Sequence, residues 1–581
     1  MDLAHFLSDN FVPRIPPKKT SNRHDAAKLL GKTEDQESTA SLQSSTMAID
    51  TALDRKLRGR HVQLLGIGAT IGLALFVSIG LGLARGGPLN LLLAFILWSF
   101  PILFITISTA EMVTYLPITS PFVCMAGRCC DLALEVMTAW NFWFLCSAQI
   151  PFEIITVSSI LKYWRSDFSV AIPVSVQMVV YFVIAVFRVS VFGEVEFWLS
   201  LGKVIMAVGL IFFTFITMVG GNPKHWAFGF IYWQNPGPMN VFHSTGNLGR
   251  FEGFLACLIR ATFMFSGPEY VSLVASETIN PRKTLPSAYK QVFTRLTVFF
   301  IGGALCVGIL VPYNDPTLQN TAGVTLPGAA GSPYVIAMQN LGISVMPDIV
   351  NALLISSAFS AGNSYTYCSS RTLYGFASNG YAPHFLTATT KTEVPIYCMI
   401  VALLWALIAF LQLNDDTAKV LNWIIGFITS CQLINFSSIC LTYVFFYRAL
   451  KAQGIDRNTF PFVGWYQPWL AIIGGALAFV MIFVGTYTMF LPGQWNYRSF
   501  LFSYLMIFVD IGIFVLYKLF ARTKWRKAEE VDLTTGLKEV EEHEKMFYRQ
   551  LKEEGKMNEE GRIKRTFAQR FFTVIFGSEI K

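Results

Sequence analysis

Five consecutive residues, Phe265 to Glu269, combine helix-breaking and ionisable groups at the centre of an apolar run. Residues 253–275 are apolar enough to cross a bilayer, yet Gly267 and Pro268 break helices and Glu269 carries a carboxylate. An unpaired carboxylate is costly in hydrocarbon. A helix broken at membrane depth is tolerated only where the freed backbone groups face a cavity, a ligand or other protein. Transporters place broken helices at their substrate sites, so this segment predicts solute binding.

The first apolar run, residues 63–84, carries a second candidate break. Three glycines within seven residues, Gly66, Gly68 and Gly72, lower the cost of unwinding a helix there. The N–H groups at a broken helix end would attract a carboxylate. Close helix packing through small residues is the alternative, and taken alone it would be preferred. The break five spans later favours unwinding.

Two breaks five spans apart are expected of two inverted five-span repeats whose first helices unwind at the midplane. The later break frees carbonyl groups near Phe263, Met264 and Ser266, which can accept hydrogen bonds from an ammonium group. The predicted substrate-binding residues are Gly68, Thr70, Ile71, Gly72, Leu73 and Ala74 in the first span and Phe263, Met264, Phe265, Ser266 and Gly267 in the sixth.

Three intramembrane charges are candidates for proton coupling. Lys203 lies in the apolar run 197–218, where a lysine near an unwound first span can replace a sodium ion, or can snorkel to an interface. Glu153 is a carboxylate at depth in the third run. Glu269, if protonated, can act as a proton-linked switch. Alternatively, it is a structural carboxylate bonded to backbone N–H groups of the broken segment.

Two further charges have simpler expected roles. Arg260 lies nine residues before Glu269, and we expect it to snorkel outward rather than guard a vestibule. Glu111 lies near the inner end of the second run, where we expect it to organise the inner gate.

The elements that must position these residues are membrane-spanning helices. The chain of 581 residues is 53% hydrophobic and only 14% charged, with a mean hydropathy of +0.48, which a soluble domain of this size would not show. We predict an all-α polytopic membrane protein with about twelve transmembrane helices and a five-plus-five inverted repeat in which helices 1 and 6 are broken. The predicted spans are 63–84, 89–115, 133–161, 170–192, 195–220, 251–275, 293–313, 346–375, 395–413, 420–447, 467–490 and 499–521.

Charge around the spans predicts the topology. Lys and Arg are more frequent in the even-numbered connections, which places both termini in the cytosol. Residues 1–60 form a predicted cytosolic tail that is mostly disordered, residues 61–521 the twelve-span domain, and residues 522–581 a cytosolic tail with an amphipathic helix. That helix, around residues 563–576, suits docking on anionic lipid or on the protein's own inner face. Both tails could bind cytosolic regulators.

Several other functions find little support. The seven histidines lie in tails or loops without metal-ligand pairing, and no nucleotide-binding motif occurs. We therefore expect no enzyme activity, no metal and no cofactor. The net charge of +8 reflects topology in the lipid bilayer and not nucleic-acid binding. Transport would depend on an ion gradient or on the gradient of the solute itself.

Several motifs in order along the chain form one pattern, and they include Gly68-Ala69-Thr70-Ile71-Gly72, Arg85-Gly86-Gly87-Pro88, Trp140-Asn141-Phe142-Trp143, Gly193-Glu194-Val195-Glu196-Phe197, Phe265-Ser266-Gly267-Pro268-Glu269 and Tyr381-Ala382-Pro383. Through these motifs the chain resembles the fungal amino-acid permeases of the amino acid–polyamine–organocation superfamily over about residues 50–520. The resemblance implies proton symport of amino acids at the plasma membrane, with Lys203 at the family's span-5 lysine position.

Two departures from the family pattern bear on the substrate. Gly72-Leu73-Ala74 stands where the family usually has Gly-Thr-Gly, and Pro268 stands where it usually has Thr. The wider pattern is similar to the subgroup linked with carnitine and polyamine uptake. The resemblance therefore implies an importer of amino acids or related zwitterions, such as carnitine. A permease-like nutrient sensor, or a regulator of other transporters with weak or no transport, is the alternative.

Overall fold

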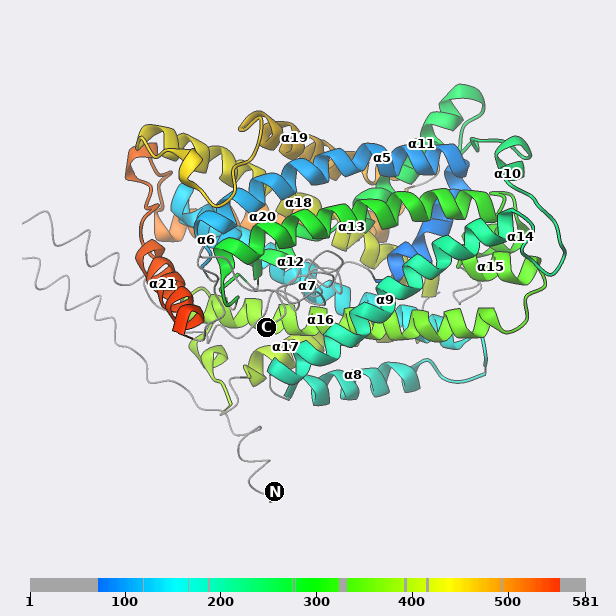
Figure 1. The fold of residues 1–581 in the computed structure, drawn as a ribbon, viewed down its shortest axis with the longest axis horizontal. Coiled ribbons are helices and arrows are strands. Elements are labelled where there is room, and N and C mark those ends of the chain that lie inside the picture. The colour runs from blue at the N-terminus through cyan, green and yellow to red at the C-terminus, as the bar shows by residue number, and fades with distance from the viewer. Residues whose placement is uncertain are drawn as a thin grey trace, which may run out of the picture.

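The computed structural model describes residues 72–553, apart from residues 119, 166, 187–188, 274, 277, 323–331, 391–393, 414–416, 492 and 494. This part of the chain is built from helices and contains no β-strand. The longest helices run along the long axis of the molecule (Figure 1). α21 (Leu537–Glu553) lies at one end of this bundle and α10 (Ile231–Gln234) at the other, and we call these the α21 end and the α10 end.

A helix lies at each of the twelve predicted spans. α5 (Ser78–Tyr115) contains the end of the first span and the whole of the second. The remaining spans are, in chain order, α7 (Leu132–Leu161), α8 (Ala171–Val186), α9 (Val189–Met218), α11 (Gly246–Met264) with α12 (Pro268–Leu273), α13 (Pro281–Leu310), α16 (Met346–Ser378), α17 (Ile396–Trp405) with η4 (Ala406–Leu413), α18 (Thr417–Ala452), α19 (Trp469–Val484) with η6 (Tyr487–Phe490), and α20 (Tyr497–Ala521).

Length and apolar composition support a membrane-spanning bundle. Seven helices among the described residues are long and apolar enough to cross a bilayer, and two shorter apolar segments accompany them. Shorter helices connect the spans, namely α6 (Pro121–Cys129), α14 (Pro316–Ala322) and α15 (Pro333–Asn340), and η1 (Leu73–Leu75) lies within the first span. The predicted all-α polytopic fold is therefore confirmed. Residues 1–60 and the predicted amphipathic helix around 563–576 lie outside the described residues.

α5 consists of two spans joined by a sharp turn at Gly87. Its φ of +80° is a conformation that other residues rarely adopt. The long connection between α9 and α11 packs over this turn: the backbone N–H of Asn240 donates to the carbonyl of Gly86 at 2.9 Å, and its side-chain amide donates to the carbonyl of Ala84 at 2.8 Å. A Cβ at position 87 would lie 2.8 Å from the Asn240 nitrogen, so only glycine fits.

The first half of α5 packs closely against α11. The Cys257 thiol in α11 donates to the carbonyl of Gly82 at 3.2 Å. A Cβ on Gly86 would lie 2.6 Å from the carbonyl oxygen of Gly253. Small residues on both helices let their backbones approach in this way. The first and sixth spans, which are predicted to contain the two breaks, are therefore neighbours in the halves that lie toward the α10 end.

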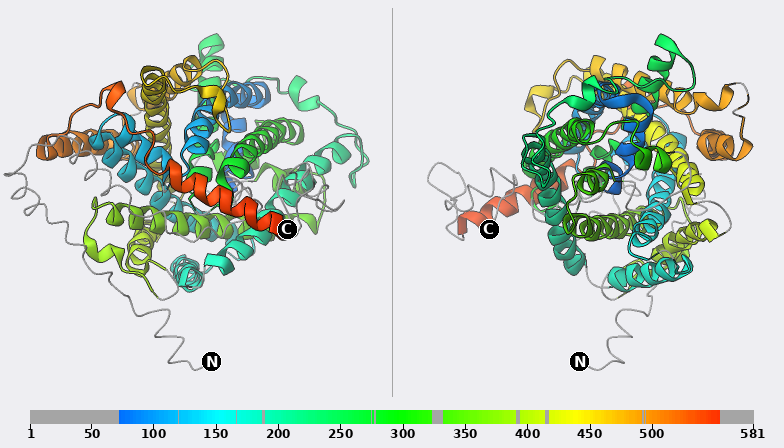
Figure 2. Two further views of the ribbon diagram at one scale, coloured as in Figure 1. Left: turned by 60° about the vertical axis from the view of Figure 1, so that its left-hand side comes forward. Right: turned by 90° about the vertical axis from the view of Figure 1, so that its right-hand side faces the viewer.

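The segment that follows α20 packs on the α21 end of the bundle. Its helix α21 crosses this end in Figure 2 (left). Its Arg526 N–H donates to the carbonyl of Cys130 at 2.8 Å. The Tyr115 hydroxyl donates to the carbonyl of Leu533 at 3.1 Å, and Arg128 donates to that of Thr535 at 2.8 Å. Leu533 is almost fully buried. This part of the C-terminal segment is thus packed on the protein itself.

Glu111 connects spans 2 and 10 at the same end. Its carboxylate is fully buried and accepts hydrogen bonds from Arg457 Nε at 2.7 Å and Nη2 at 2.9 Å. The Tyr443 hydroxyl and the Gly464 N–H also donate to it, both at 2.8 Å. The hydrogen bonds with Glu111 raise the pKa of Arg457, so the guanidinium stays charged at any physiological pH.

Replacing Arg457 by methionine should lower the free energy of unfolding by about 3 kcal/mol, because it leaves the buried Glu111 carboxylate without its cation. Chemical unfolding of the detergent-purified protein measures this loss. Arg448→Met is the matched control, since Arg448 is an exposed arginine near the end of α18, nine residues before Arg457. Equal stability of the two variants would contradict a stabilising role for the Glu111–Arg457 pair.

Candidate functional site

The sixth span is broken where the sequence predicts it. α11 ends at Met264, residues 265–267 are not helical, and α12 begins at Pro268. Gly267 has a φ of +153°, which L-residues rarely adopt. Pro268 occupies the first position of α12, where a missing N–H costs nothing because that group has no partner within the helix. Gly267 and Pro268 together therefore fix the place of the break.

The break frees carbonyl groups for identifiable reasons. In an unbroken helix the carbonyl of Phe263 would accept from the N–H of residue 267, and that of Met264 from residue 268. The Gly267 N–H instead donates to Glu269 Oε2 at 3.3 Å, and Pro268 has no N–H. Both carbonyls have thus lost their helical donors. Phe263, Met264, Phe265 and Ser266 are all buried.

Glu269 holds the broken segment together. Its side chain is fully buried, and one oxygen accepts the Gly267 N–H while the other accepts from Gln432 Nε2 of α18 at 3.4 Å. Gln432 Nε2 also donates to the carbonyl of Phe265 at 3.1 Å. These contacts are those expected of a structural carboxylate. They place Gln432, which the sequence did not single out, at the break.

The first span is irregular where its structure is described. Gly72 lies in a bend, residues 73–75 form the short helix η1, and α5 begins at Ser78. The carbonyl of Phe76, just before α5, accepts a hydrogen bond from Ser332 at 2.8 Å. Ala74 is half-buried. Gly68, Thr70 and Ile71, and the side chain of Leu73, lie outside the described residues.

Two consecutive residues of α7 bring the breaks together. A Cβ built on Gly72 would lie 2.6 Å from Glu153 Oε1, so the first break directly faces this carboxylate. The neighbouring Phe152 ring packs edge-on against Phe263 of the sixth span, with 5.4 Å between ring centroids. Glu153 is buried, and its second oxygen has no hydrogen-bond partner among the described residues. Gly72, Glu153 and Phe263, all predicted as site residues, thus line one region.

Lys203 belongs to the same region, in a cluster of three buried charges. It is 2% exposed and so does not snorkel to an interface. It interacts electrostatically with Glu153 and with Glu196, a buried residue seven positions earlier on α9. Glu196 Oε1 accepts hydrogen bonds from Ser200 at 3.1 Å and from Ser360 of α16 at 2.8 Å. We call Glu153, Glu196 and Lys203 the charge cluster.

Glu269 has its own partners, and none of them belongs to the charge cluster. Those partners are Gly267 and Gln432, and its carboxylate also acts electrostatically on Tyr289 of α13. Tyr365 of α16 lies within electrostatic range of both Glu153 and Glu269. The three coupling candidates named from the sequence therefore divide into a pair, Lys203 with Glu153, and a separate carboxylate.

Sequence reasoning singled out neither Glu196 nor Asp510, which are two of the buried carboxylates in the helices. Glu196 could have been found, because a spacing of seven residues places it two turns from Lys203 on one face of a helix. Asp510 is an acidic residue in the apolar helix α20; it is 3% exposed, and neither of its oxygens has a hydrogen-bond partner within the described part of the chain. Across the same part, no His, Cys, Asp or Glu side chains group as a metal site requires.

Comparisons with known proteins give a consistent result. Residues 61–530 match the family model described as amino acid permease. A general amino acid permease of Saccharomyces cerevisiae, AGP2, is 52% identical over 504 residues, which cover 85% of this chain and 84% of its own. A dicarboxylic amino acid permease of the same yeast is 33% identical, covering 91% and 87%. A proline-specific permease of Emericella nidulans is 34% identical, covering 84% and 90%.

The contacts of Glu269 lead to a stability prediction. Glu269→Ala leaves the Gly267 N–H and the Gln432 amide without an acceptor, so the free energy of unfolding should fall by about 1–3 kcal/mol. Glu269→Gln keeps an oxygen that can accept, and should cost clearly less. Chemical unfolding in detergent distinguishes the two variants. Wild-type stability of Glu269→Ala would show that the carboxylate does not hold the break.

Proposed function

The chain belongs to the amino acid permease family, and from this we propose that it is a secondary active transporter that imports amino acids or related zwitterions by proton symport. The observation that carries the proposal is the meeting of both irregular spans at Phe152 and Glu153 of α7. A zwitterion needs donors for its carboxylate and acceptors for its ammonium group. Two interrupted helices facing one another offer both.

We assign the acceptors to the sixth span and the donors to the first. The carbonyls of Phe263 and Met264 have lost their helical donors and can accept from a substrate ammonium group. The backbone N–H groups from Gly68 to Ala74 are the proposed donors to the carboxylate. Glu153 faces Gly72 and would repel this carboxylate when ionised, and its pairing with Lys203 or with a bound proton removes the repulsion. The Ser266 carbonyl is a third proposed acceptor, because the Tyr270 N–H donates to the carbonyl of Gly267 at 3.2 Å instead. Phe265 and Gly267 shape the break itself.

The charge cluster supports coupling to protons. One lysine and two carboxylates carry a net charge of −1 when all are ionised, and one bound proton makes the cluster neutral. Because net charge is costly in hydrocarbon, transfer across the membrane favours the protonated cluster. We therefore propose Lys203 and Glu153 as coupling residues together with Glu196, and we keep Glu269 as a third candidate through Tyr365, which is in range of both carboxylates.

We propose the plasma membrane as the location, with both termini in the cytosol. The α21 end, where the chain after α20 is bound, is then the cytosolic end, and its tails are available to regulators. Leu73 and Ala74 add bulk and remove a hydroxyl compared with the usual family pattern. This favours substrates other than the common amino acids, and carnitine-like zwitterions or polyamines are the compounds to test first.

Reconstitution in proteoliposomes tests the function directly. We expect saturable accumulation of one member of a panel of amino acids, carnitine and polyamines, stimulated by an inward proton gradient. Saturable binding without any flux would overturn the proposal in favour of a sensor. Flux that does not change with the proton gradient would overturn proton symport but not transport itself.

Glu153→Gln should reduce proton-stimulated accumulation at least about tenfold, because the cluster loses a protonatable group; tenfold corresponds to about 1.4 kcal/mol. Exchange of labelled for unlabelled substrate should persist. Glu135→Gln is the matched control, a buried carboxylate about 27 Å away along the same α7. Wild-type gradient dependence of Glu153→Gln would remove Glu153 from coupling.

Gly72→Ala should raise KM about fivefold or more, as an overpacking cost of about 1 kcal/mol implies. The added methyl group displaces the Glu153 carboxylate from the first break. Gly209→Ala in α9 is the control, since a Cβ there meets nothing within 4 Å. Initial rates of uptake across substrate concentrations provide the comparison, and an unchanged KM would place the substrate elsewhere.

A further inference from the structure

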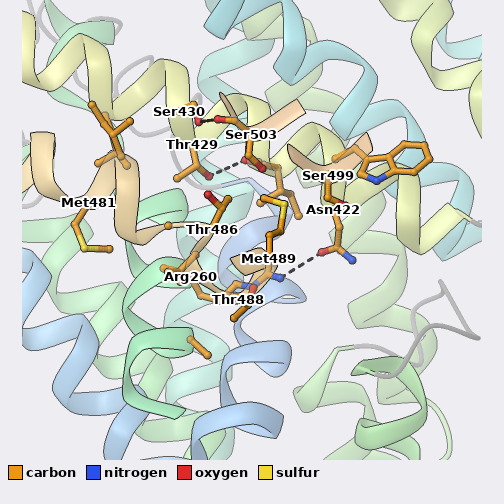
Figure 3. A pocket seen from close by; sticks show the side chains of 18 of the residues that line it. Arg260, Asn422, Thr429, Ser430, Met481, Thr486, Thr488, Met489, Ser499 and Ser503 are labelled. Carbon is orange, nitrogen blue, oxygen red and sulfur yellow. Dashed lines mark hydrogen bonds between the residues drawn. The ribbon is translucent and has the colours of Figure 1, made fainter. Parts of the chain in front are cut away.

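A cavity of about 290 Å³ is lined by residues of α11, α18, α20 and the end of α19, and by Arg85 of α5. Figure 3 shows this cavity from close by. We call it the Arg260 cavity. None of its lining residues comes from α7, α9 or α16, the helices that hold the charge cluster. None of the predicted substrate-binding or coupling residues lines it either, so it lies apart from the proposed transport site. Leu433, one of its lining residues, follows directly on Gln432, which contacts the break in span 6.

Arg260 is the dominant charge of this cavity. It is 6% exposed, so the expectation that it snorkels to the surface is wrong. Its guanidinium donates to Asn422 Oδ1 at 3.3 Å, the contact drawn in Figure 3. Among the described residues it makes no ion pair with a carboxylate within 4.0 Å. A buried guanidinium held by a single neutral amide is costly unless an anion accompanies it.

The surroundings of Arg260 increase its need for an anion. The titratable groups that act on it are Arg85, a second cation, and Cys257, a buried thiol. Arg85 also lines the cavity, with its guanidinium 5.2 Å from the centre of the Phe242 ring. The acid on the same helix, Glu252, accepts instead from the backbone N–H and the hydroxyl of Ser244, at 2.8 and 2.9 Å.

Hydroxyl groups supply further donors to an anion. Six line the cavity: Thr429, Ser430, Thr486, Thr488, Ser499 and Ser503. Thr429 and Ser430 already donate to backbone carbonyls, of Ile425 and Ser503. The Thr486 hydroxyl is buried and has no partner within the described part of the chain. Two cations with a free buried hydroxyl form the surroundings of an oxyanion.

The rest of the wall indicates an organic ligand. Leu433, Met481, Ile482 and Met489 present apolar side chains to the same space. A volume of about 290 Å³ is at the small end of ligand pockets and larger than a monatomic ion requires. We propose that the Arg260 cavity binds a small organic carboxylate, with Arg260 and Thr486 on the carboxylate and the apolar wall around its carbon chain.

Occupancy would join α11 to α18 and α19. Arg260 lies four residues before Met264, one turn from the break in span 6. A ligand there therefore stabilises the half of span 6 at the α10 end against its neighbours. This makes the cavity a second site, separate from the one where both broken spans meet.

Thermal unfolding of the full-length protein in detergent tests the proposal with sodium butyrate, at ionic strength matched with sodium chloride. Butyrate has no ammonium group and lacks half of the contacts proposed at the transport site. The wild type should gain about 2 °C in Tm, saturably, at roughly tenfold excess over Kd. Arg250→Gln, an exposed arginine on the same helix, should behave like the wild type.

Arg260→Gln should abolish the gain, and without butyrate it should melt at or above the wild-type temperature, because an unpaired buried cation has been removed. Thr486→Val should bind butyrate several-fold more weakly at unchanged basal Tm, and it tests the site even where Arg260→Gln does not fold. No gain in the wild type, an equal gain with chloride or an equal gain in Arg260→Gln would each overturn the proposal. The transport assays remain independent of every one of these results.

Discussion

A peptide group that loses its helical partner inside a bilayer must find another, because hydrocarbon offers neither donors nor acceptors. The break in span 6 follows this constraint closely. The Gly267 N–H is taken by Glu269, the carbonyl of Phe265 is taken by Gln432, and Pro268 has no N–H to satisfy. The carbonyls of Phe263, Met264 and Ser266 have no helical donor after these replacements. They are the groups with which we propose that the protein binds its cargo, so the binding site follows from how the break is stabilised.

α7 connects this break to the rest of the protein. Asn141 donates to the carbonyl of Cys431 in α18 at 2.8 Å, and the hydroxyls of Ser147 and Ser369 of α16 share a hydrogen bond of 2.7 Å. A buried helix fixed to two neighbours is a rigid support for Phe152 and Glu153. Both irregular spans contact this support, which keeps the substrate groups and the charge cluster in register.

The buried charges of this protein differ in the partners that balance them, and these differences separate structural from functional roles. Glu111 has a cation and two further donors, so it is fully satisfied and its role is to hold two spans together. Glu153, Glu196 and Lys203 interact as two carboxylates with one lysine, and we propose that one proton balances the second carboxylate. Arg260 faces a second cation and no carboxylate among the described residues, which is why we infer a bound anion there.

The sequence by itself determined the fold class, the position of the break in span 6 and the identity of most intramembrane charges, because hydrophobic runs, Gly267, Pro268 and stray charges are local signals. It also singled out Gly72, Glu153 and Lys203, which the structure brings into one region. Only the tertiary structure decided which charges meet: Glu196 joins Lys203, Gln432 reaches Glu269 across 163 positions of sequence, and Arg260 turns into a cavity rather than to the surface. The physical reason is that helical periodicity fixes the faces of each helix, whereas the rotation of one helix against another depends on side-chain packing between segments far apart in the chain.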